Sequence, residues 1–130
     1  MTQNNRPVII NTPDAPQPGG HYSQALIHNG LVYVSGLLPV KPGGEKVKGS
    51  IEEQISQVLA NLEAILKAAG LSRNHVLKTT IYISDVELWG RVNKIYSEFF
   101  DTHKPARAIV PVKPLHFGFS VELEATAAIF

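Results

Sequence analysis

The sequence predicts an α+β fold in a single domain of residues 1–130, with a mixed β-sheet and two helices packed on one of its faces. Two segments repeat apolar residues at helical spacing. The other apolar runs are short and rich in β-branched and aromatic residues, which is typical of strands. The elements follow one another as three strands, a helix, a strand, a helix and two strands. Two helices among runs of strands favour this fold class.

The first elements are three short strands. Pro7–Ile10 is predicted to be an edge strand, and residues 11–20 are predicted to be a loop because they are rich in proline and glycine. Gln24–His28 and Leu31–Ser35 flank Asn29-Gly30. This dipeptide is the strongest short-range signal for a hairpin, so the two segments are predicted to pair.

The first helix is predicted to follow a second Gly-rich loop at residues 41–49. Ser50 and Glu53 match a capping box at the start of the helix, and Gly70 suits a left-handed cap at its end. One apolar stripe at helical spacing joins the two caps. The stripe consists of Ile51, Ile55, Val58, Leu59, Leu62, Ile65 and Leu66.

The second half of the chain is predicted to hold a strand, a helix and two more strands. Val76–Ile83 is the strand, and Asp85 suits an N-cap for the region beyond it. Helical spacing then continues to about Phe100, and Arg107–Val112 and Phe119–Ile129 are the last two strands. The residues that carry the helical spacing are Leu88, Val92, Ile95, Tyr96 and Phe99.

The strands hold more apolar residues than two helices are expected to cover, so a second apolar sheet face, and with it self-association, is predicted. The residues concerned are Val32, Val34, Ile81, Ile83, Val110, Val112, Val121 and Leu123.

The composition argues against several classes of function. Twelve Lys and Arg against 11 Asp and Glu give a net charge of +1, which offers little reason to expect nucleic-acid binding. The lack of cysteine excludes disulfides, thiolate catalysis and Cys-based metal sites, and the five histidines are not spaced as a metal pair. No stretch approaches the ~20 apolar residues of a membrane span, and residues 1–6 show no signal peptide. We therefore expect a cytoplasmic protein without a metal, a nucleic-acid partner or a membrane partner.

Arg107 and two carboxylates are the main candidates for chemistry. Arg107 opens an apolar strand, where a charge is costly to bury unless it is paired. Its planar fork of donors suits the carboxylate of a small molecule, although a structural ion pair is the alternative. Glu122 and Glu124 have the same parity on the last strand and so share a sheet face, opposite Val121 and Leu123. One of the two is expected to be a simple solvent-facing residue.

Four further positions have both a structural and a functional interpretation. Gly36, after Ser35, is either a bend or a backbone amide that is free to meet an anion. Tyr22 either caps the core or lines the mouth of a pocket. Asn93 is a poor residue for a helix interior, so it is either exposed or hydrogen-bonded to a neighbouring loop or subunit. His116 lies between Arg107 and Glu122 in the sequence and either contacts a ligand or is solvated.

Seven segments, in order, resemble the RidA (YjgF/YER057c/UK114) family of imine deaminases, and they cover nearly all of the chain after Gly19. They are residues 20–25 (Gly-His-Tyr-Ser-Gln-Ala), 34–36 (Val-Ser-Gly), the helix at 54–70, and residues 76–80 (Val-Leu-Lys-Thr-Thr), 92–96 (Val-Asn-Lys-Ile-Tyr), 105–107 (Pro-Ala-Arg) and 121–125 (Val-Glu-Leu-Glu-Ala).

The resemblance implies a chorismate-mutase-like fold, a homotrimer with ligand clefts between subunits, and hydrolysis of imino or enamine acids, such as 2-aminoacrylate, to 2-keto acids and ammonia. Arg107 matches the essential arginine that holds the substrate carboxylate, and Glu122 matches the glutamate that activates water. Tyr22, Ser35, Gly36 and Asn93 match positions that line the cleft. No cofactor is implied, because a protonated imine is already electrophilic.

The chain also departs from the family pattern. Leu37 and Ile109 stand where relatives often carry glutamine and cysteine, and Pro114–Phe119 replaces a more charged loop. We expect Ile109 to line a more apolar cleft that accepts a larger apolar imine. Two alternatives are a non-catalytic trimer that binds small carboxylates as a sensor or regulator, and an RNA-cleaving or translation-inhibiting protein. The near-neutral charge argues against the latter.

Overall fold

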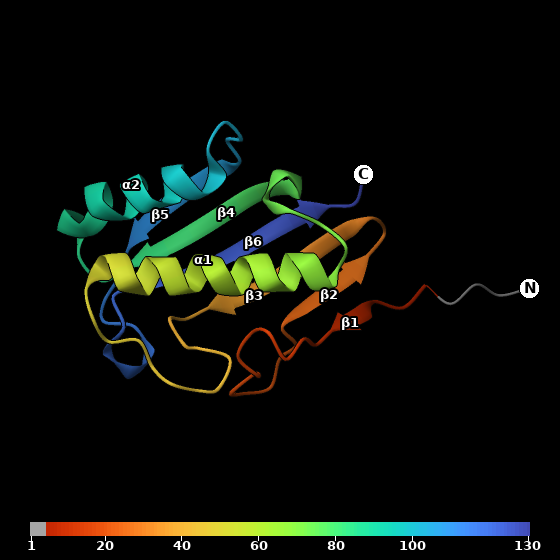
Figure 1. The fold of residues 1–130 in the computed structure, drawn as a ribbon, viewed down its shortest axis with the longest axis horizontal. Coiled ribbons are helices and arrows are strands. Elements are labelled where there is room, and N and C mark those ends of the chain that lie inside the picture. Colours follow the sequence, from red (N-terminus) through yellow and green to blue (C-terminus); the bar gives the residue numbers. More distant parts are fainter. Residues whose placement is uncertain (1–4) are drawn as a thin grey trace, which may run out of the picture.

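A six-stranded mixed sheet carries two helices on one face in the computed structural model, which describes residues 5–130 (Figure 1). The α+β prediction is therefore confirmed. The polar start of the chain, from which we inferred the lack of a signal peptide, lies partly outside the described residues. The strands are β1 (Val8–Ile10), β2 (Ala25–His28), β3 (Leu31–Leu37), β4 (Val76–Ile83), β5 (Ala106–Pro111) and β6 (Val121–Ala128), and the helices are α1 (Ile51–Ala68) and α2 (Trp89–Phe100).

The sheet has the order β1-β2-β3-β6-β4-β5. All neighbours are antiparallel except β4 and β5, which are parallel because α2 returns the chain across the sheet between them. Helix α1 packs on β3 and β6, and α2 covers the edge formed by β4 and β5 (Figure 1). Within residues 5–130, no helix combines the length and apolar character needed to cross a bilayer.

The predicted local signals are found at the ends of these elements. Asn29 and Gly30 have φ values of +50° and +78°, the left-handed conformations that a tight hairpin turn requires. Ser50 Oγ accepts the backbone N–H of Glu53 at 3.1 Å, which is the serine half of the predicted capping box, whereas the Glu53 carboxylate accepts from Ser50 Oγ and not from the Ser50 backbone. Gly70 has a φ of +78° at the end of α1. Asp85 caps a single 3₁₀ turn that leads directly into α2.

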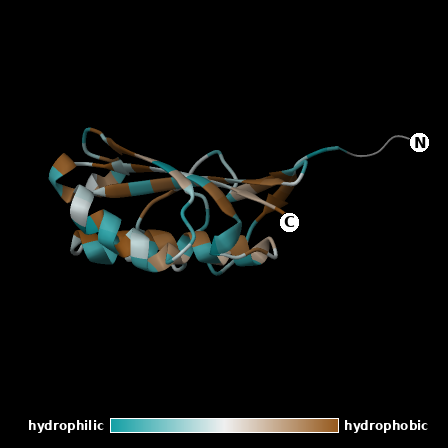
Figure 2. Ribbon diagram, turned by 90° about the horizontal axis from the view of Figure 1, so that it is seen from above, coloured by the Kyte–Doolittle hydropathy of each residue, from teal (hydrophilic) through white to brown (hydrophobic). Residues whose placement is uncertain are grey.

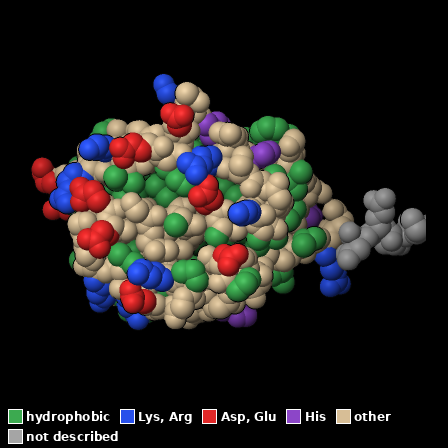
Figure 3. Space-filling model, in the orientation of Figure 1, with side chains coloured by type: hydrophobic (Ala, Val, Ile, Leu, Met, Phe, Trp, Pro, Cys, Tyr) green, Lys and Arg blue, Asp and Glu red, His purple; other side chains and the backbone are tan. Residues whose placement is uncertain are grey.

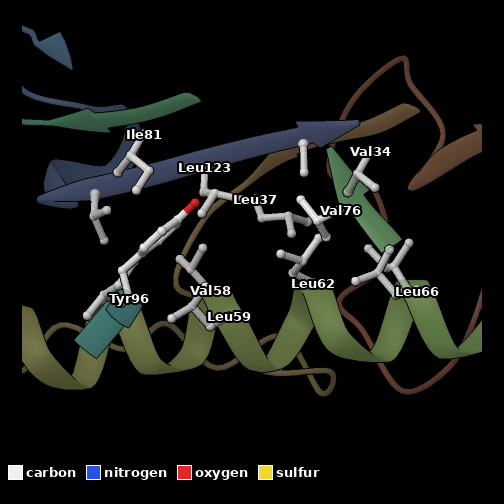
Figure 4. Close-up of a cluster of buried hydrophobic side chains, with 14 of the residues drawn as sticks. Val34, Leu37, Val58, Leu59, Leu62, Leu66, Val76, Ile81, Tyr96 and Leu123 are labelled. Carbon is white, nitrogen blue, oxygen red and sulfur yellow. The ribbon is translucent and has the colours of Figure 1, made fainter. Parts of the chain in front are cut away.

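The core lies between the sheet and the helices, and Figure 2 shows these two layers edge-on. The apolar stripe of α1 meets the inward side chains of β3, β4 and β6 (Figure 4). Val58, Leu62, Ile81 and Leu123 are all fully buried there.

The prediction of a second apolar sheet face is wrong for six of the eight residues named for it. Val32, Val34, Ile81, Ile83, Val121 and Leu123 are all buried on the helix-covered side, because the strand register gives them the same parity. Val110 and Val112 are only partly buried. The open face is mixed. It carries the apolar residues Ile9, Leu26, Leu31, Ala108 and Val110 together with Tyr33, Lys78, Thr80, Tyr82, Glu124 and Thr126. The apolar residues of this face differ from those named from the sequence, and self-association through the face stays a prediction.

Candidate functional site

A pocket of about 630 Å³ opens beside the end of β3, between the loop before β2 and the loops that carry Lys46 and Phe117. Residues from β3, β6 and these three loops meet in it. Five of the candidate residues from the sequence line this pocket, namely Tyr22, Ser35, Gly36, His116 and Glu122.

Glu122 lies against the backbone of Gly36. A Cβ atom added at Gly36 would collide with the Glu122 carboxylate, so the glycine is there for close approach. Burial raises the pKa of the Glu122 carboxyl above its ordinary value, the nearby charge of Glu124 raises it further, and His116 opposes the shift. A raised pKa makes a carboxyl group better suited to accepting and returning a proton.

Tyr22 and Ser35 are fixed by hydrogen bonds to the backbone. Tyr22 is 52% exposed, and its phenol oxygen accepts the N–H of Gly19 at 3.2 Å, so it lines the pocket and does not cap the core. Ser35 Oγ donates to the carbonyl of Ser23 at 2.6 Å. The Ser35 hydroxyl thus ties β3 to the loop and keeps lone pairs that can accept a further hydrogen bond.

Arg107 lies outside this pocket, in a second cluster on α2 and β5. Its Nη1 donates to Asn93 Oδ1 at 2.8 Å, and its guanidinium lies 4.8 Å from the centre of the Tyr96 ring. The indole of Trp89 is 5.6 Å away. Ile109 follows Arg107 on the same side of β5 and packs against the core. Asn93 therefore contacts the arginine and is not an idle surface residue.

The two clusters lie on opposite faces of the sheet. Arg107 is paired with Thr79, whose side chain is buried under α2 against Tyr96. Glu122 is paired with Tyr82, which belongs to the open face. Because the sheet lies between them, one chain cannot place Arg107 and Glu122 around the same small molecule.

The family model described as "Endoribonuclease L-PSP" matches residues 12–129. The chain belongs to this family, which is the RidA (YjgF) family. A RutC family protein of Pyrococcus horikoshii is 43% identical over 120 residues, covering 92% of this chain and 95% of that protein. A protein of Rattus norvegicus named 2-iminobutanoate/2-iminopropanoate deaminase is 42% identical over 120 residues, covering 92% of this chain and 88% of its own.

Solved structures of RidA-family proteins share the fold. YyfA of Yersinia pestis, described as belonging to the conserved Rid protein family, is 40% identical with a TM-score of 0.92, covering 95% of this chain and 100% of its own. The structure of E. coli TdcF with bound serine is 34% identical with a TM-score of 0.90, covering 95% of this chain and 99% of its own.

Some residues of this RidA-family site could not be found from the sequence. Lys46 lies 4.5 Å from the centre of the Phe117 ring at the pocket wall, although neither residue stands in a motif. Leu37, which we expected in the cleft, borders the pocket but is only 6% exposed and belongs mainly to the core. Trp89 gave no signal beyond its position at the start of a helix.

Two further observations concern metal ligands and the distribution of surface charge. Within residues 5–130, no three His, Asp or Glu side chains are grouped as metal ligands. Acidic and basic side chains alternate over the helix-covered face, without a large patch of one sign (Figure 3).

Proposed function

We propose that this chain hydrolyses 2-imino and enamine acids to 2-keto acids and ammonia. The observation that carries the proposal is the guanidinium of Arg107, which Asn93 and two aromatic rings hold in place on β5. A fixed guanidinium fork binds a carboxylate with defined geometry. The deaminase names of the rat and human relatives and the serine bound to TdcF, itself a small amino acid, support the same chemistry.

In the proposed reaction, Arg107 binds the substrate carboxylate and Glu122 handles protons. The ionised Glu122 carboxylate takes a proton from a water molecule as its oxygen adds to the iminium carbon, which gives a neutral carbinolamine. The protonated Glu122 then returns this proton to the nitrogen. The C–N bond breaks as the C=O bond forms, and the hydroxyl proton leaves with ammonia as ammonium. Positioning of the substrate and the water supplies much of the acceleration.

We further propose that two chains share each site, in a chorismate-mutase-like homotrimer with clefts between subunits. The support is that Arg107, Asn93 and Ile109 lie on one face of the sheet whereas Glu122 lies on the other. A neighbouring chain would have to bring its Arg107 cluster to the Glu122 pocket of the first.

Mixing of two impaired variants tests this sharing. In an assembly of Arg107→Ala and Glu122→Gln chains, a cleft between an intact Arg107 and an intact Glu122 is complete, so co-expression should restore activity that neither variant has alone. The control is a mixture of the two variants that were purified separately and do not exchange chains between their assemblies. No recovery on co-expression, together with a trimer by light scattering, would refute the shared site.

A coupled assay tests the activity itself. An amino-acid oxidase generates the imine in the presence of semicarbazide, and the protein should reduce the yield of semicarbazone. Arg107→Ala should abolish this effect while the protein stays folded by circular dichroism. If the wild type has no effect on any imine, the deaminase proposal fails.

The pocket also favours a larger side chain on the imine. Leu38, Val40 and Phe117 line the same pocket as Glu122. An imine made from leucine should therefore be hydrolysed faster than one made from alanine, because the apolar wall gains contact only with the larger group. A clear preference for the alanine-derived imine would contradict this.

A non-catalytic role is the second candidate. A relative from Lactococcus lactis, 45% identical over 122 residues, carries the name of a regulator, AldR. If the chain is such a binder, small carboxylates should bind in an Arg107-dependent manner while no imine is turned over.

A further inference from the structure

Three aromatic or polar residues of α2 surround the Arg107 guanidinium. Trp89, Asn93 and Tyr96 follow one another at i, i+4 and i+7, so they form one stripe on the side of α2 that meets β5. Asn93 supplies the hydrogen bond to Nη1, and Tyr96 lies under the guanidinium, fixed by a 2.8 Å hydrogen bond between its hydroxyl and Thr79 Oγ1.

Trp89 differs from the other two because a large part of it is open. It is 44% exposed, whereas Tyr96 is 6% exposed. Within residues 5–130 its indole has no recorded hydrogen bond, and the one charged group recorded against its ring is the Arg107 guanidinium at 5.6 Å. An indole beside a guanidinium attracts the cation through its ring and excludes water from one side of it.

The arginine is only partly engaged by the chain. Within residues 5–130 its one recorded hydrogen bond is the one to Asn93, which uses a donor of Nη1. The donors of Nε and Nη2 are therefore available for the two oxygens of a carboxylate. A carboxylate bound in this way would share the guanidinium with the ring contacts of Trp89 and Tyr96.

We propose that Trp89 is a positioning residue for Arg107 and forms one wall of the carboxylate site. The inference rests on the proposed role of Arg107 and extends it to a residue that neither the sequence motifs nor the names of the relatives assign. The indole limits the positions open to the guanidinium and keeps water from the ion pair. An ion pair is stronger where water is excluded.

The sequence contains a single tryptophan, so its fluorescence reports on this one place. The probe is 2-hydroxybutanoate, a carboxylate that does not react and does not absorb at the excitation wavelength. Titration into the full-length wild type should give a saturable change in emission, with a midpoint equal to the Kd from calorimetry. Arg107→Ala should abolish both the fluorescence change and the heat of binding.

Substitutions of Trp89 then distinguish a positioning role from a purely structural one. Trp89→Leu should raise the Kd for 2-hydroxybutanoate about two- to fivefold, because the guanidinium loses the cation–π contact that holds it in the binding geometry before the carboxylate binds. KM for the imine should rise by a similar factor with kcat nearly unchanged, and Trp89→Phe should restore most of the affinity. Val86→Ala, which shortens an exposed side chain of the preceding turn, is the matched control and should change neither quantity.

The outcomes distinguish this inference from the proposed function. If Arg107→Ala abolishes binding but Trp89→Leu binds like the wild type, or the wild-type emission does not respond, the role of Trp89 is refuted and that of Arg107 stands. If Arg107→Ala binds 2-hydroxybutanoate as the wild type does, the proposed carboxylate site fails, and the role of Trp89 fails with it. Should Trp89→Leu not fold, the wild-type titration and Trp89→Phe still decide.

Discussion

Replacement of Gly36 by alanine is the sharpest test of the Glu122 pocket. The added methyl group would occupy the place of the Glu122 carboxylate, so this carboxylate must move. The backbone itself accepts alanine, because φ of Gly36 lies outside the left-handed region that favours glycine. The substitution therefore displaces one functional group and strains little else.

The expected magnitude follows from that collision. The Glu122 carboxylate is at the end of a flexible side chain and can move away from the added methyl group. The free energy of unfolding should therefore change by less than ~1 kcal/mol. A shift of about 1 Å in a catalytic group costs about 100-fold in rate, or ~2.7 kcal/mol in activation free energy. We therefore expect Gly36→Ala to lower kcat/KM about 100-fold with little change in the unfolding midpoint.

The assay is the semicarbazide competition combined with thermal unfolding. Gly43→Ala is the matched control, because a Cβ there has no atom within 4 Å and φ is not left-handed. In a double-mutant cycle, Gly36→Ala should add little loss to Glu122→Gln, since both act through one carboxylate. Full activity of Gly36→Ala, or fully additive losses, would refute the argument that Gly36 serves Glu122.

Three other predictions concern protonation, the guanidinium fork and the start of α2. Burial raises the pKa of Glu122 above its ordinary value of 4.5. Between the pKa of the unfolded chain and the higher pKa of the folded state, the folded state binds more protons, so stability should fall as the pH rises through this window. Activity should rise over the same window as the carboxylate ionises, and Glu122→Gln should flatten both curves, measured by thermal unfolding and by the imine assay; an unchanged stability slope would contradict this. Arg107→Lys should lose most of the activity, because an ammonium cannot hold the Asn93 oxygen and a carboxylate in one fork; turnover like the wild type would contradict the bidentate contact. Gly90→Ala should raise the free energy of unfolding by about 0.5–1 kcal/mol, since Gly90 is an exposed helical residue with open space around its Cα; a lower denaturation midpoint in urea would contradict this.

Local chemistry predicted most of the fold. Asn29-Gly30 allowed the hairpin to be placed, and Ser50 and Gly70 marked the ends of α1 to within a residue or two. These signals depend on the conformations that a few neighbouring residues allow, so they can be recognised without knowledge of the rest of the chain. The same parity argument correctly placed Glu122 and Glu124 on one face and Val121 and Leu123 on the other.

Register between distant strands was not predictable in the same way. Leu37 shares the buried face with Val32 and Val34, although its number has the opposite parity, only because the β3–β6 pairing shifts between Val34 and Leu37. Likewise, the pairing of Arg107 with Thr79 and of Glu122 with Tyr82 decides that the two charged residues lie on opposite faces. A slip of one residue in either pairing would reverse the side.

Two buried glutamines explain why the pocket keeps its shape, and neither was assigned a role from the sequence. Gln24 Oε1 accepts the N–H of Thr12 at 2.7 Å, and its Nε2 donates to the carbonyl of Thr12 at 3.0 Å, so one amide holds the proline-rich loop against β2. Gln54, on α1, accepts the N–H of Ser120 at 2.9 Å immediately before β6 begins. A buried amide that satisfies backbone groups fixes them strongly, because each would be costly to leave unpaired. Gln54 on α1 thus fixes the start of β6, two residues before Glu122, although it lies 66 positions earlier than Ser120 in the sequence. Gln24 fixes the loop that carries Tyr22.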